Sequence, residues 1–207
     1  MGITQCAYAE LAVDDLDRSL GFHTDVIEMV ELGRENGTVS LGCGADQRCD
    51  LVLRNGGTGV RLVALEVESE EDLERYAGRL SDRGVDSARR SDPRAGVADA
   101  LCFASPSGLA VELVLTKEGP AYLNPGQSDH RGGIAPIDFD HITLKVPDPV
   151  AMVAFLTGAL GFSVSDEMRP APDVLVAAWT RAGSQHHDIA MFKGPELNTW
   201  GLRLDAR

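Results

Sequence analysis

The sequence predicts an α+β fold built from repeated βαβββ modules, whose strands form curved mixed sheets flanked by helices. Two observations support this prediction. First, residues 8–29 align without gaps with residues 141–162 at a constant offset of 133, so that Tyr8 corresponds to His141. Second, each copy reads as an alternating strand, an acidic turn and an amphipathic helix. A third, looser copy begins at Val60, which gives three modules of about 55 residues each.

The individual elements follow from local signals in each copy. Ser69, followed by acidic residues, predicts a helix start, and Gly84 predicts the end of that helix. Short apolar runs with strand character follow each helix: residues 38–41, 50–53, 100–103, 109–116, 174–180 and 188–192.

The domain organisation is inferred from a change in composition. Residues 118–135 are rich in Gly, Pro and polar side chains, which is typical of a linker. We therefore predict an N-terminal domain of two modules over residues 1–117. A C-terminal domain over residues 136–207 would hold one module and one strand of an incomplete fourth module.

Composition excludes several classes of protein. The 32 acidic against 19 basic residues give a net charge of −13, which opposes binding to nucleic acids or anionic membranes. No apolar run approaches the length of a membrane span, and the first residues lack a signal-peptide pattern, so we expect a cytoplasmic protein. The four cysteines show no CxxC spacing and are expected to be free thiols: Cys6, Cys43, Cys49 and Cys102.

Three phrases carry a resemblance to a known superfamily. They are SPSGLAVELVLT, DFDHITLKVPD and QHHDIAMFKGP, over residues 105–116, 138–148 and 185–195. Together with the paired modules, they resemble the vicinal oxygen chelate superfamily, which includes glyoxalases, bleomycin-resistance proteins and type I extradiol dioxygenases. The last two phrases look most like the catalytic domain of two-domain extradiol dioxygenases that cleave catechols such as dihydroxybiphenyl.

The resemblance implies a metal site that this sequence matches only in part. In the family, two histidines and one glutamate hold Fe(II) and leave positions for catecholate and dioxygen. His141 matches the first ligand, and His187 matches a histidine proposed to move protons beside the open positions. The second histidine position falls on Thr199, and the glutamate position would lie beyond Arg207. We therefore expect an incomplete iron site, with Fe(II) bound only if the family chemistry survives.

Two carboxylates are further candidates for metal ligands. Glu112 stands in the second module where the glutamate ligand would stand in the fourth, but the matching strand positions there are Tyr8 and Leu62 rather than histidines. Structural hydrogen bonding is the alternative for Glu112. Asp188 could complete a site in a dimer.

The positions of other residues within the modules predict their roles. Trp179 and Met191, together with Thr199, are predicted to line a substrate pocket, with an ordinary core role as the alternative. His186 is expected to point away from His187 and to be exposed, because neighbouring strand side chains alternate. His23 and His130 are expected at the surface.

Three functions are compatible with these features. The first is an extradiol-dioxygenase-like protein that acts on or binds an aromatic, catechol-type molecule. The second is a metal-free small-molecule binding or resistance protein. The third is a metal-independent isomerase, cyclase or lyase in which His141 and His187 act as acid and base. A homodimer or larger homo-oligomer is also expected, because a lone third module leaves a sheet edge unpaired.

Overall fold

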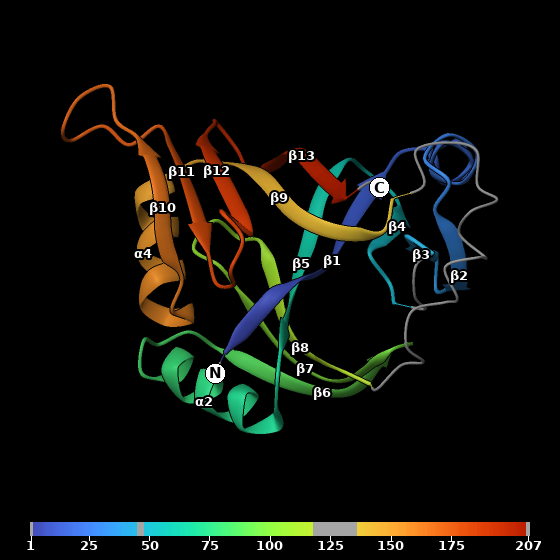
Figure 1. The fold of residues 1–207 in the computed structure, drawn as a ribbon, viewed down its shortest axis with the longest axis horizontal. Helices are drawn as coiled ribbons and strands as arrows, with labels where there is room; N and C mark the ends of the chain where they lie inside the picture. Colours follow the sequence, from blue (N-terminus) through green and yellow to red (C-terminus); the bar gives the residue numbers. More distant parts are fainter. Residues whose placement is uncertain (1, 45–47, 118–135, 206–207) are drawn as a thin grey trace.

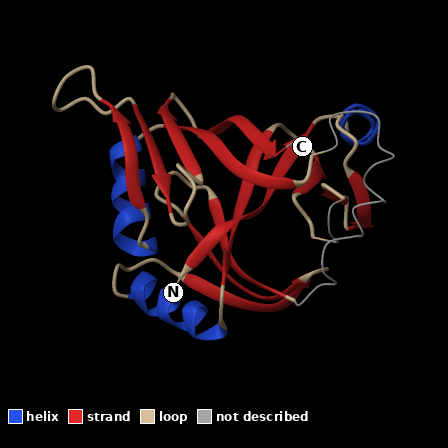
Figure 2. Cartoon of the chain, viewed as in Figure 1, coloured by secondary structure: helices blue, strands red, loops and turns tan. Residues whose placement is uncertain are grey.

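The computed structural model describes residues 2–44, 48–117 and 136–205. These residues form two curved sheets that lie one above the other, with the helices on the outside (Figures 1 and 2). The linker predicted for residues 118–135 lies outside the described residues, so the domain boundary stays a prediction. Among the helices in the described ranges, none combines the length and apolar character needed to cross a membrane.

The first sheet has eight strands in the order β2-β3-β4-β1-β5-β8-β7-β6. Each half of it is one module, and the two modules join where β1 and β5 pair antiparallel. Within each module the first strand pairs parallel with the last, as β1 does with β4 and β5 with β8. The bounds are β1 Ile3–Val13, β2 Val30–Glu35, β3 Thr38–Gly42, β4 Leu51–Asn55, β5 Gly59–Val67, β6 Ser87–Arg94, β7 Val97–Ala104 and β8 Ala110–Thr116.

The second sheet repeats this plan in the order β10-β11-β12-β9-β13. Strand β9 pairs parallel with β12 and antiparallel with β13, as β1 does with β4 and β5. The predicted α+β fold of βαβββ modules is therefore confirmed. The bounds are β9 Asp138–Val146, β10 Ser163–Met168, β11 Ala177–Arg181, β12 Ile189–Lys193 and β13 Asn198–Asp205.

The helices begin where the sequence predicts. Helices α1 (Leu16–Gly21), α2 (Glu70–Ser81) and α4 (Pro149–Leu160) each follow a side chain that accepts a hydrogen bond from a backbone N–H of the first turn. Asp15 and Asp148, which the offset of 133 relates, are two of these N-caps, and Ser69 is the third. The repeat thus includes the capping chemistry.

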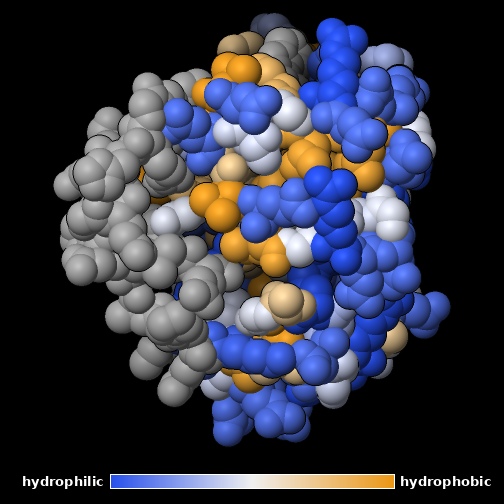
Figure 3. All heavy atoms as spheres, turned by 90° about the vertical axis from the view of Figure 1, so that its right-hand side faces the viewer, coloured by the Kyte–Doolittle hydropathy of each residue, from blue (hydrophilic) through white to orange (hydrophobic). Residues whose placement is uncertain are grey.

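The two related helices differ beyond their starts. Helix α1 passes into a π-helical turn, η1 (Phe22–Val26), whereas α4 continues regularly. Phe155 is buried against Phe103, but its counterpart Phe22 is 51% exposed. Three further apolar side chains from η1 and β2 are also exposed: Val26, Val30 and Leu32. Figure 3 faces this side of the molecule and shows apolar side chains among polar ones.

One strand of each module did not stand out in the sequence. Strands β2, β6 and β10 lie at the outer edges of their modules, and their residues are almost all exposed. An edge strand with both faces in solvent needs no apolar alternation, so the pattern that marks the other strands is missing.

A large apolar cluster spans the two sheets. It contains Leu65 and Leu73 from the second module, Ile142 and Leu156 from the third, and Cys6 from β1. Residues on both sides of the predicted linker thus share one core, which fixes the second sheet against the first.

The N-caps give a first prediction. Asp148→Ala should lower the free energy of unfolding by about 1 kcal/mol, because an N–H at the start of α4 loses its acceptor. Asp148→Asn should retain most of the stability, since its side-chain oxygen can accept the same hydrogen bond. Urea denaturation of the three proteins measures the difference. Equal losses in both variants would contradict the capping role.

Candidate active site

The strand pattern of β9 places His141 on the face of the second sheet opposite the core. Ile142 and Leu144 belong to the core cluster, so the side chains between and before them, including His141 and Thr143, point the other way. Trp179 of β11 and Phe192 of β12 lie on this same side and contact each other edge to face, with ring centroids 5.6 Å apart. We call the side chains of His141, Thr143, Trp179 and Phe192 the histidine face.

His141 is held by a carboxylate next to it in the sequence. Its Nδ1 lies 2.6 Å from Oδ2 of Asp140. Because a carboxylate accepts hydrogen bonds, Nδ1 carries the hydrogen, and in the neutral ring Nε2 is then the acceptor or ligand atom. Arg203, which faces His141 across the β9–β13 pair, has its Nε 3.7 Å from the same carboxylate oxygen.

The structure brings His187 to His141. Their ring centroids are 4.1 Å apart with the planes tilted by 52°, although the two residues are 46 positions apart in the sequence. His187 lies in the loop before β12 rather than on the strand. His186 is exposed, as predicted, but the predicted alternation does not apply in a loop, and its Nδ1 lies 2.9 Å from Nδ1 of His187.

His187 is neutral around pH 7. Partial burial, followed by repulsion from His141 and His186, lowers its pKa to about 4. The two imidazoles therefore have different environments: His141 is tied to a carboxylate, whereas burial and the two neighbouring imidazoles disfavour the charged form of His187. A neutral imidazole beside an oriented one offers a hydrogen-bond acceptor to a bound molecule.

The loop that carries His187 packs against strand β1. The Sγ of Cys6 donates to the carbonyl of Asp188 at 3.3 Å. A Cβ at Gly183 would come within 2.5 Å of the carbonyl oxygen of Thr4, so this close approach of two backbones requires glycine. Burial and the neighbouring carboxylates, Asp188 first, raise the pKa of the Cys6 thiol well above its ordinary value, so it stays protonated as a donor.

Asp188 has a structural role in this loop. It is 1% exposed, and its Oδ2 accepts hydrogen bonds from the backbone N–H groups of Ala182 and Gly183 at 2.7 and 3.3 Å. Burial raises its pKa, while these two hydrogen bonds oppose the increase. The carboxylate suggested as a metal ligand is therefore already used to close the β11–β12 turn.

The residues present do not fit a metal site of the predicted kind. Within the described ranges, no three side chains of the His, Cys, Asp and Glu types come close enough together to hold a metal ion. His141 has a free Nε2, but neither Asp188 nor Glu112 joins it.

The other predicted site residues are spread over different surroundings. Met191 is fully buried in the core cluster, which is the core alternative stated for it above. Trp179 lies on the histidine face. Thr199 pairs with Leu144, which lies three positions along β9 from His141. The position on β13 that corresponds to Leu62 on β5 is occupied by Gly201, not by Thr199.

Glu112 belongs to a separate buried group in the first sheet. It is 4% exposed, and its Oε2 accepts a hydrogen bond of 2.6 Å from the hydroxyl of Tyr8. Cys102 contacts its other oxygen at 3.5 Å, and the guanidinium of Arg94 lies 4.4 Å from the centre of the Tyr8 ring. These contacts agree with the structural hydrogen-bonding alternative for Glu112.

Sequence reasoning missed Asp140, Arg203 and Arg94. Asp140 directly precedes His141, and a carboxylate beside a candidate histidine is a signal that could have been used. Arg203 and Arg94 lie on strands whose pairing partners cannot be read from local pattern. Their roles depend on register, which only the structure gives.

Comparison with known proteins agrees with this architecture. Residues 138–199 match the family model of the Glyoxalase/Bleomycin resistance protein/Dioxygenase superfamily. The predicted resemblance is thereby confirmed for the third module, which holds both His141 and His187.

The chain is similar in sequence to curated extradiol dioxygenases. It is 22% identical over 205 residues to the manganese-dependent 2,3-dihydroxybiphenyl 1,2-dioxygenase of Geobacillus genomosp. 3, covering 94% of this chain and 65% of that protein. It is 28% identical over 213 residues to the biphenyl-2,3-diol 1,2-dioxygenase of Pseudomonas sp. strain KKS102, covering 94% and 69%. The chain therefore spans about two thirds of the length of these relatives.

Solved structures show the same fold. The 2,3-dioxygenase LapB from Pseudomonas sp. KL28 superposes with a TM-score of 0.86 at 24% identity, over 98% of this chain and 73% of that chain. An extradiol ring-cleaving dioxygenase from B. fuscum superposes with a TM-score of 0.81 at 26% identity, over 95% and 56%. Both sheets thus follow the plan of these enzymes.

The lowered pKa of His187 predicts a pH dependence of stability. An unfolded chain binds the proton of this histidine near pH 6.5, whereas the folded protein binds it only near pH 4. The free energy of unfolding should therefore fall as the pH decreases from about 6.5 to 4. In His187→Gln this decrease should be smaller.

Chemical denaturation at several pH values measures the effect. The raised pKa of Asp188 acts with the opposite sign, but Asp188 is present in both proteins, so their difference isolates His187. Parallel stability curves for the two proteins would contradict the prediction.

The Tyr8–Glu112 pair gives a further prediction. Tyr8→Phe removes the hydroxyl but keeps the ring that contacts Arg94, and it leaves a buried carboxylate oxygen without its donor. The free energy of unfolding should fall by about 1–3 kcal/mol. Thermal or urea denaturation measures it, and a change below about 0.3 kcal/mol would show that the hydrogen bond contributes little.

Proposed function

We propose that this chain, which resembles the extradiol dioxygenases of the Glyoxalase/Bleomycin resistance protein/Dioxygenase superfamily, is a dioxygenase-like protein that binds a catechol-type aromatic molecule on the histidine face. The observation that supports this most is the contact between His141 and His187, with ring centroids 4.1 Å apart. It lies within the segment that matches the family model.

The histidine face suits an aromatic diol on chemical grounds. Trp179 and Phe192 offer ring surfaces, and aromatic pairs gain stability from edge-to-face or offset contacts. His141, on the same face of the sheet, and His187, which contacts it, offer polar atoms. Nε2 of neutral His141 can accept a hydrogen bond from one hydroxyl, and neutral His187 can accept a hydrogen bond from the other.

A metal ion is not part of the proposed binding step. The described residues supply no three-ligand site, so catechol binding by the histidines should persist in the presence of a chelator. A relative is named as manganese-dependent, and both Fe(II) and Mn(II) therefore belong in the test of ring cleavage.

The difference between the two histidines favours a second candidate function. A pair of imidazoles in contrasting environments can serve as base and acid in a metal-independent isomerase, cyclase or lyase. Conversion of a bound phenol that continues in the presence of chelator and without dioxygen would favour this function over ring cleavage.

The test is an anaerobic titration of the protein with 2,3-dihydroxybiphenyl, measured by calorimetry with and without EDTA. We expect saturable binding in both conditions. His187→Ala should weaken it about tenfold, which corresponds to ~1.4 kcal/mol. His23→Ala is the matched control, because His23 lies on η1 of the first module and not on the second sheet.

Three outcomes discriminate among the possibilities. Absence of binding at millimolar concentration, or equal affinity in both variants, would refute the proposal. A coloured ring-cleavage product after addition of Fe(II) or Mn(II) and air would support dioxygenase activity and require metal ligands from outside the described residues. Binding without turnover would support a binding function.

A further inference from the structure

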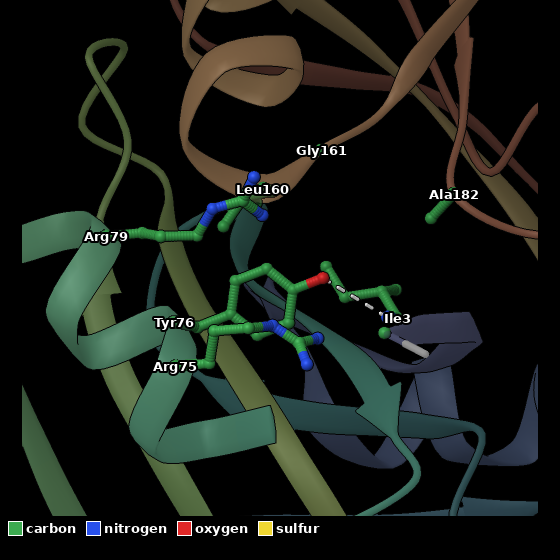
Figure 4. A pocket seen from close by; sticks show the side chains of 8 residues that line it. Ile3, Arg75, Tyr76, Arg79, Leu160, Gly161 and Ala182 are labelled. Atoms are coloured by element: carbon green, nitrogen blue, oxygen red, sulfur yellow. Dashed lines mark hydrogen bonds between the residues drawn. The ribbon is translucent and has the colours of Figure 1, made fainter. Parts of the chain in front are cut away.

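A groove of about 520 Å³ lies between helix α2 and the end of helix α4, where the second module meets the third. Figure 4 shows Arg75, Tyr76 and Arg79 of α2 side by side, with Leu160 of α4 and the C-cap Gly161 above them and Ala182 opposite. Neither the histidine face nor the Tyr8–Glu112 group contributes to its lining.

The groove is basic in an acidic protein. The chain carries a net charge of −13, yet Arg75 and Arg79 are the only charged residues among the described residues that line the groove. Arg75 is paired with Asp72 at 2.5 Å. No carboxylate in the described part of the chain lies within ion-pair distance of the Arg79 guanidinium, which lies 5.8 Å from the centre of the Tyr76 ring.

Tyr76 adds a hydrogen-bond donor at the bottom of the groove. Its side chain is 3% exposed, and its hydroxyl oxygen accepts from the N–H of Ile3 at 3.4 Å. The hydroxyl hydrogen has no acceptor among the described residues. A buried donor without an acceptor is costly, and an anion in the groove would supply one.

Gly161 lies beside Arg79 in the groove. Gly161 has a φ of 77°, which favours glycine. A Cβ at this position would lie 3.3 Å from Nη1 of Arg79, so the absence of a side chain leaves room for the guanidinium. Ile3 and Leu160 also line the groove but are buried, so its accessible lining is mostly polar. The groove thus offers two guanidinium groups and a hydroxyl.

We propose that this groove is a binding site for a small organic acid, in which Arg79 and Tyr76 bind the carboxylate. Arginine recognises a planar carboxylate through paired N–H donors. The site is independent of the histidine face and of the proposed catechol binding.

Binding should also stabilise the fold, because the ligand would contact both α2 and α4. A ligand that binds only the folded state raises the Tm, by roughly 5 °C at a hundredfold excess over its Kd. Binding should weaken with salt, since half-exposed guanidinium groups are screened.

The experiment titrates the protein with benzoate, acetate and inorganic phosphate, using calorimetry for Kd and thermal denaturation for the Tm. We expect benzoate and acetate to bind more tightly than phosphate. Arg79→Gln should weaken benzoate binding at least tenfold. Arg83→Gln is the matched control, because it removes the same charge from an exposed residue four positions further along that does not line the groove.

The outcomes are distinct. Loss of benzoate binding in Arg79→Gln but not in Arg83→Gln supports the site. Phosphate binding as tight as benzoate would overturn the organic-acid assignment. Absence of saturable binding, or equal affinity in both variants, would overturn the site itself. A lower Tm of Arg79→Gln with unchanged affinity would show that Arg79 only stabilises the end of α4.

Discussion

The close packing of strand β1 against the loop before β12 is the contact on which the candidate site depends. The backbone at Gly183 approaches the carbonyl of Thr4, and Cys6 donates to the carbonyl of Asp188. Asp188 in turn binds the N–H groups of the same loop. The loop that presents His187 to His141 therefore depends on β1, so the first module supports the site through this strand.

Much of the fold could be predicted from the sequence because its signals are local. Neighbouring residues set the alternation of β9 and the N-caps at Asp15 and Asp148. The offset of 133 relates the two N-caps directly. The exposed edge strands lack such signals. The pairing of His141 with Arg203 and the position of Gly201 opposite Thr143 depend on register and β-bulges, which no local pattern specifies.

The repeat shows how one backbone position takes different chemistry in each half. Tyr8 and His141 occupy equivalent places on β1 and β9, and each is bound by a carboxylate. For Tyr8 the carboxylate is Glu112, which comes from the far strand β8 and is buried. For His141 it is the adjacent Asp140, which leaves Nε2 available. In the first sheet the Tyr8 hydroxyl is therefore engaged in a buried hydrogen bond. In the second sheet Nε2 of His141 is available beside His187.

The two positions also differ in what they can offer to a bound molecule. Burial and the neighbouring Glu112 raise the pKa of Tyr8, despite the opposing charge of Arg94, so its proton stays on the hydroxyl. Burial and neighbouring imidazoles lower the pKa of His187, so its ring stays neutral. The Tyr8 hydroxyl is engaged by Glu112, whereas the neutral His187 imidazole can accept a hydrogen bond from a bound molecule. The chemistry therefore depends on what surrounds each position, more than on the module that the two halves share.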